Sequence, residues 1–128
     1  MAPAVSAGRG GPAVLTRAVS SGLAAGGVAA RARPVRMARL AAAGGPLPPT
    51  WLVRLLGGRS VAQHGLVLLR PSRGVVLGGA AIDALHALSM VGAAAVWPQY
   101  RRPALASAGM AGASVALALA TAPRENSR

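Results

Sequence analysis

The stretch that decides the fold is residues 74–97, GVVLGGAAIDALHALSMVGAAAVW, whose only ionisable side chains are Asp83 and His86. The hydrocarbon core of a bilayer is about 30 Å thick, so a helix crosses it with about 20 apolar residues. The stretch exceeds that length, Ser72 can cap it, and Pro98 follows it. It therefore predicts a membrane-spanning helix.

A second uncharged run covers residues 104–122, between Pro103, which suits the first turn of a helix, and Pro123. The run is rich in Ala and would insert weakly by itself, but it can pair with the preceding helix as a hairpin. The predicted fold class is therefore an all-α membrane protein with two spans, at about residues 74–97 and 104–122. A polar tail at 123–128 follows them.

One or two amphipathic helices are predicted before the hairpin. Thr50 can cap a short helix that ends at Gly57, and a second helix covers residues 59–70. Arg54 and Arg59 would each cost about 2.5–3.5 kcal/mol at the centre of a bilayer. We therefore expect these helices to lie at the membrane interface or beside the spans, which makes residues 50–122 one helical membrane domain.

Residues 1–49 are rich in Ala, Gly, Pro and Arg and are predicted to form a disordered tail. Their longest uncharged stretch is too short to span a bilayer. A targeting or membrane-inserted segment within residues 13–30 is an alternative. Residues 28–30 come close to the small-residue cleavage site of a signal peptide. A translation start at Met37 instead of Met1 is a further alternative, because Met37 follows an arginine cluster.

The composition favours lipid over water as the solvent of this protein. The chain is 53% hydrophobic, yet it has no Phe, one Tyr and two Trp, so its apolar content is mostly Ala, Val, Leu and Gly. Such side chains bury little area each and would make a weak water-soluble core. In a membrane the same small residues let helices approach closely.

The charge balance favours an anionic partner. All 14 basic residues are Arg, against two acidic ones, and the net charge is +12. Such a charge attracts phospholipid or nucleic acid, but the cluster of Arg31, Arg33, Arg36 and Arg39 has no aromatic residues beside it for base stacking. Anionic membrane lipids are the expected partners, self-association or another membrane protein is left open, and nucleic acid is not expected.

Positions spaced alternately by three and four residues along the main stretch form a heptad seam, so they share one helix face. The seam comprises Val76, Gly79, Asp83, His86, Met90, Ala93 and Trp97. Small residues four apart also occur at Gly74 and Gly78, at Ser107 and Ala111, and at Gly112 and Ala116. We expect Gly74, Gly78, Gly79 and Met90 to pack against a neighbouring helix.

Asp83 and His86 are neighbours on one helix face, and ionisable residues at membrane depth mark a functional site by default. The candidate polar site comprises Asp83, His86, Arg59, Gln63 and Arg54. We expect a structural lock in which Asp83 bonds His86 or accepts from Arg59 or Arg54. A proton relay or ligand site that uses Asp83 and His86 is the main alternative, and haem ligation by His64 and His86 is a weaker one.

No catalytic, cofactor-binding or metal-binding residues are predicted, and we do not expect an enzyme. The sequence has no glycine-rich phosphate loop, nucleophile elbow or metal-ligand spacing. Ser89 lies three residues after His86, but Ser, His and Asp on one helix face do not take the geometry of a catalytic triad. The absence of cysteine excludes disulfides and thiolate chemistry.

Several short motifs resemble small uncharacterised integral-membrane proteins of high-GC actinobacteria. They are Leu56-Gly57, Arg59, Gln63, the stretch DALHALSM at residues 83–90, and Arg101-Arg102-Pro103. The resemblance covers about residues 50–122 and leaves the N-terminal third unmatched. It implies a helical membrane protein, and it transfers no function because no activity is attached to that group.

The predicted function is therefore a structural or partner-binding subunit in a multi-pass protein of the cell membrane. A membrane-embedded ligand-binding or relay protein is the first alternative, and a basic, disordered nucleic-acid-binding protein is the second. Arg70, Arg73, Arg124 and Arg128 flank one side of the hairpin, against Arg101 and Arg102 on the other. By the positive-inside tendency, the hairpin alone predicts cytoplasmic ends and an outer loop at residues 99–102.

Overall fold

The computed structural model describes residues 11–124, and this part of the chain is built from helices. The helices are α1 (Gly11–Ala32), α2 (Pro34–Ala42), α3 (Thr50–Leu69), α4 (Arg73–Val96), the short 3-10 helix η1 (Pro98–Tyr100) and α5 (Arg101–Thr121). The all-α class predicted from the sequence is therefore confirmed.

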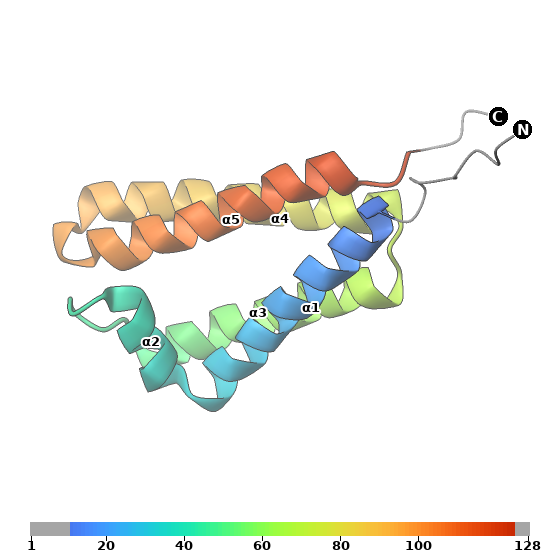
Figure 1. The fold of residues 1–128 in the computed structure, drawn as a ribbon. Coiled ribbons are helices and arrows are strands. Elements are labelled where there is room, and N and C mark those ends of the chain that lie inside the picture. The colour runs from blue at the N-terminus through green and yellow to red at the C-terminus, as the bar shows by residue number, and fades with distance from the viewer. Residues whose placement is uncertain (1–10, 125–128) are drawn as a thin grey trace, which may run out of the picture.

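The four long helices form two antiparallel pairs that lie one over the other (Figure 1). In one pair α1 packs along α3, and in the other α4 packs along α5. The short helix α2 lies at the end of the molecule where η1 turns the chain from α4 into α5, and it touches α1, α3 and α5. The beginning of α1, the end of α5 and the α3–α4 connection lie at the opposite end.

Three helical segments are long and apolar enough to cross a membrane: Gly11–Ala32, Arg73–Val96 and Pro98–Thr121. The second and third correspond to the two spans predicted from the sequence. The first lies in the segment predicted to be a disordered tail, so by length and hydropathy the chain has one more candidate span than the two predicted. Helix α3 does not reach this hydropathy, because Arg54, Arg59 and Gln63 interrupt its apolar sequence.

The predicted disorder of residues 1–49 is wrong for most of this segment, because residues 11–32 and 34–42 are helical. Residues 1–10 of the predicted tail lie outside the described part, as do residues 125–128 of the polar tail. Ala, Leu and Arg favour helix, and contact with α3 supplies the packing that a sequence window cannot show. Ser60 on α3, for example, donates from its Oγ to the carbonyl oxygen of Leu23 on α1 at 3.0 Å.

The predicted break at Gly57 is also wrong, because α3 runs without interruption from Thr50 to Leu69. A Cβ atom added at Gly57 would stand 2.7 Å from the carbonyl oxygen of Gly27 on α1. A glycine inside a helix lowers its stability by about 1 kcal/mol relative to alanine. At Gly57 this cost is offset because the glycine lets the backbones of α1 and α3 pack closely. The N-cap of α3 is Pro49 instead of Thr50, whereas Ser72 caps α4 as predicted, accepting from the Val75 amide at 3.3 Å.

Helices α4 and α5 pack along each other, and most of their buried positions are small residues. These include Ala80, Ala94, Ala104, Ala108 and Ala111. Gly79 faces α3, where a Cβ would meet the Gln63 side chain at 3.4 Å, but Cβ atoms at Gly74 and Gly78 would meet nothing within 4 Å. Within the described part of the chain, Gly79 therefore packs against a neighbouring helix, whereas Gly74 and Gly78 do not. Met90 is half-buried.

Candidate functional site

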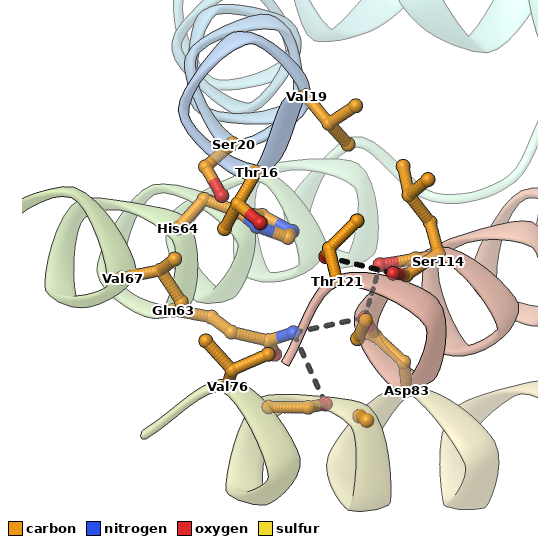
Figure 2. A pocket seen from close by; sticks show the side chains of 14 residues that line it. Thr16, Val19, Ser20, Gln63, His64, Val67, Val76, Asp83, Ser114 and Thr121 are labelled. Carbon is orange, nitrogen blue, oxygen red and sulfur yellow. Dashed lines mark hydrogen bonds between the residues drawn. The ribbon is translucent and has the colours of Figure 1, made fainter. Parts of the chain in front are cut away.

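Asp83 is the centre of a buried polar cluster between the two helical pairs. It lies near the middle of α4, and only 6% of its surface is exposed. Its Oδ1 forms an ion pair with Nη2 of Arg59, and its Oδ2 accepts from Gln63 Nε2 at 2.9 Å and from Ser114 Oγ at 2.7 Å. The carboxylate thus connects α4 to both α3 and α5 (Figure 2).

Gln63 holds the α3 side of this cluster in place. Its Nε2 also donates to the carbonyl oxygen of Gly79 at 3.2 Å, and its Oε1 accepts a long hydrogen bond from Arg59 at 3.4 Å. Arg59 and Gln63 are four residues apart on α3, so they lie on one face of that helix. The Gln63 amide thus bonds both the side chain of Asp83 (Figure 2) and the backbone of α4.

His86 bonds α5 and not Asp83. Its Nε2 lies 2.9 Å from Ser107 Oγ, and within the described part of the chain the structure shows no hydrogen bond between His86 and Asp83. The two side chains nevertheless line one common cavity. Of the interactions considered for Asp83 from the sequence, the structure therefore contains the pair with Arg59.

Arg54 is not part of the cluster. It lies five residues before Arg59, which rotates it by about 140° around the axis of α3. It is exposed and lines a separate hollow with Arg33, Arg36 and Arg39. The structure thus brings together four of the five residues of the predicted polar site and leaves Arg54 outside.

Sequence reasoning missed Ser107 and Ser114, the two hydroxyls that α5 contributes. Together with Thr121 they are spaced by seven residues, so the three side chains share one face of an otherwise apolar helix. The seven-residue spacing of these hydroxyl groups could have identified this polar face from the sequence. Thr121 is also buried, but its hydroxyl donates to the Leu117 carbonyl of its own helix at 2.8 Å.

Two cavities adjoin the cluster. One, of about 40 Å³, lies toward the start of α1 and is lined by Ser20, His64 and Thr121 among others (Figure 2). The other, of about 140 Å³, is lined by Arg59, His64, His86, Ser107, Ser114 and Met110 among others. Nε of Arg59 is buried without a hydrogen-bond partner. The larger cavity has room for ordered water or a small ion, but it is far below the roughly 300–1,000 Å³ of small-molecule pockets and cannot hold a haem.

Comparison of the chain with protein-family models, with curated proteins and with solved structures finds no match. The chemistry of the cluster therefore has to be argued from its geometry. Within residues 11–124, no group of three His, Asp or Glu side chains is arranged to hold a metal ion. What the arrangement provides is one carboxylate with three side-chain donors, next to a small cavity that two histidines and several apolar side chains also line.

Proposed function

We propose that this chain is a small multi-pass membrane protein with a structural or partner-binding role, and that the cluster around Asp83 locks its two helical pairs together. The observation that carries the proposal is the set of donors to this carboxylate. Arg59 and Gln63 reach it from α3 and Ser114 reaches it from α5. With these partners, Asp83 is suited to holding helices in register.

The distribution of polar and apolar residues supports a membrane as the surroundings. The polar cluster lies inside the molecule, whereas large apolar side chains point outward, as on α4, where Leu85 is 68% and Leu88 is 71% exposed. In water such a surface would be an unfavourable apolar patch, and in lipid or against a partner protein it is satisfied. The ion pair places a charge of each sign side by side, which lowers the cost of burying either in a membrane.

Substitution of Asp83 tests the lock. Asp83→Asn keeps one acceptor oxygen, which can still accept from Arg59, while its amide nitrogen can donate to the Ser114 hydroxyl. We therefore expect a mild loss of folded protein in detergent. Asp83→Leu removes the acceptor and leaves the half-buried Arg59 side chain without its partner. Breaking a buried pair in this way costs about 3–5 kcal/mol in water-soluble proteins, whereas hydrogen bonds between membrane helices average about 0.6 kcal/mol. Because the Arg59 side chain is partly exposed, we expect a value between the two.

The measurement is the fraction of protein folded during titration with a denaturing detergent, after membrane fractionation of the cells. Recovery of the parent protein in the soluble fraction without detergent would remove the membrane placement. Asp83→Asn and Asp83→Leu variants that both unfold like the parent would remove the lock. These two outcomes are independent of each other.

A second candidate function is a proton relay or a site for a small polar ligand. It is favoured by the cavity of about 140 Å³ that Asp83, His64 and His86 share, and by the unpaired Nε of Arg59 that water or an ion could accept from. Under this function both Asp83 variants would fold like the parent but lose a proton-dependent activity or a bound molecule. The same two variants therefore separate the candidates.

A further inference from the structure

A second cluster of charge lies at the α2 end of the molecule, away from Asp83. Arg33, Arg36 and Arg39 from α2 and its N-cap, and Arg54 from α3, line a hollow of about 630 Å³ together with Pro34 and Val35. We call these residues the cationic hollow. All four arginines are exposed, so none of them is committed to the packing of the helices.

Among the described residues, the cationic hollow has no internal counter-ion. Its two acidic residues are Asp83 and Glu125. Asp83 pairs with Arg59, and Glu125 lies outside the described residues. Within residues 11–124, the hollow thus gathers four guanidinium groups on two helices with no carboxylate available to neutralise them. A surface of this kind is complementary to an anion from outside.

We propose that the cationic hollow binds the phosphate group of an anionic phospholipid. A guanidinium group presents a planar fork of donors that matches phosphate oxygens, and several arginines around one hollow can hold one phosphate from different sides. The inference rests on the proposed membrane placement. In that placement, the segment of α1 that can cross the membrane ends at Ala32, and α2 begins directly after it at Pro34. Helix α2 therefore lies at the level of the lipid headgroups.

Apolar side chains next to the arginines favour a lipid over free phosphate. Leu40 on α2 is 71% exposed, and Trp51, one turn before Arg54 on α3, is 65% exposed. Tryptophan is enriched at the boundary between headgroups and acyl chains, and an amphipathic helix lies in that boundary with its apolar side chains in the lipid. A phospholipid can satisfy the arginines and these apolar groups at once, whereas inorganic phosphate satisfies the arginines alone.

The test measures how much phosphatidylglycerol stays bound to the full-length protein in uncharged detergent, by native mass spectrometry, with phosphatidylcholine as the uncharged reference lipid. The variant Arg36→Gln/Arg39→Gln/Arg54→Gln removes three charges from the cationic hollow. We expect it to bind phosphatidylglycerol at least about tenfold more weakly than the parent, because each arginine near an anionic surface contributes several-fold to binding.

The matched control, Arg17→Gln/Arg70→Gln/Arg124→Gln, removes the same charge at exposed positions at the opposite end of the molecule from the hollow. We expect it to lose less than about threefold, with both variants as helical as the parent by circular dichroism. Equal losses in the two variants, or none in either, would overturn the site. Displacement of the lipid by inorganic phosphate at equal concentration would overturn the choice of a lipid. Neither result bears on membrane fractionation, so failure of the site and failure of the membrane placement are distinguishable.

Discussion

At the residue scale, the hydrogen bond between His86 and Ser107 is the simplest contact through which to test how α4 and α5 are held together. The two side chains meet at 2.9 Å across the interface. Ser107→Ala removes this hydrogen bond without adding volume, and hydrogen bonds of this kind average about 0.6 kcal/mol in membrane proteins. We expect a loss of that order in the free energy of unfolding, measured in a detergent titration.

Ser89→Ala is the matched control for Ser107→Ala. Ser89 is exposed on α4, and its hydroxyl donates to the Leu85 carbonyl of its own helix at 2.8 Å. Its removal breaks no contact between helices, so we expect almost no change in the free energy of unfolding. Equal effects of the two substitutions would show that the bond between His86 and Ser107 does not contribute to stability.

The same scale shows why the sequence could indicate the polar site only in part. Asp83 and His86 were found because charged residues are rare in an apolar helix. Their partners depend on which face of α3 meets α4, and this decides between Arg59 and Arg54. Ser114 could have been found from its heptad spacing with Ser107, but its bond to Asp83 depends on the register of α5 against α4.

At the scale of the elements, Gly27 and Gly57 set the distance between α1 and α3. A Cβ atom at Gly27 would stand 2.6 Å from the carbonyl oxygen of Gly57, which as a backbone atom cannot move aside cheaply. Gly27→Ala should therefore force the helices apart, at a cost of about 1–3 kcal/mol typical of overpacking. The measurement is again the free energy of unfolding in detergent.

Gly26→Ala provides the control, since a Cβ at Gly26 would meet nothing within 4 Å. This substitution gains up to about 1 kcal/mol of helix propensity without a clash. We expect Gly26→Ala to unfold at the same or a higher detergent concentration than the parent, and Gly27→Ala at a lower one. A Gly27→Ala variant as stable as Gly26→Ala would contradict the close packing of α1 on α3.

Local signals explain which helices the sequence could predict. Helix α4 was predicted to within one residue at each end, because an apolar run, the Ser72 cap and Pro98 all act on neighbouring residues. Helix α1 was missed because Arg17 and several glycines interrupt its apolar sequence. The continuity of α3 was missed because Gly57 packs against Gly27, thirty residues earlier in the chain. Read locally, the same glycines indicate flexibility or a helix end.

At the scale of the whole molecule, the arrangement of the helices changes the predicted orientation in the membrane. Helix α3 packs antiparallel along α1, so a membrane that α1, α4 and α5 cross is also crossed by α3. Its charged residue Arg59 is paired inside the molecule. The arginines at the α2 end are then Arg31, Arg33, Arg36, Arg39, Arg54, Arg101 and Arg102. Those at the opposite end, within the described residues, are Arg17, Arg70, Arg73 and Arg124.

This distribution predicts that the α2 end and the loop around Gln99 face the cytoplasm, the reverse of what the hairpin alone indicates. The chain has no cysteine, so single cysteines can be introduced at exposed positions and labelled from one side of sealed cells. We expect Leu47→Cys and Gln99→Cys to be protected from a membrane-impermeant reagent, and Pro71→Cys and Arg124→Cys to react. The comparison of residues 47 and 71 is the decisive one. Four crossings place them on opposite sides, whereas a lone hairpin leaves them on the same side, and labelling of both or of neither would contradict the four-crossing arrangement.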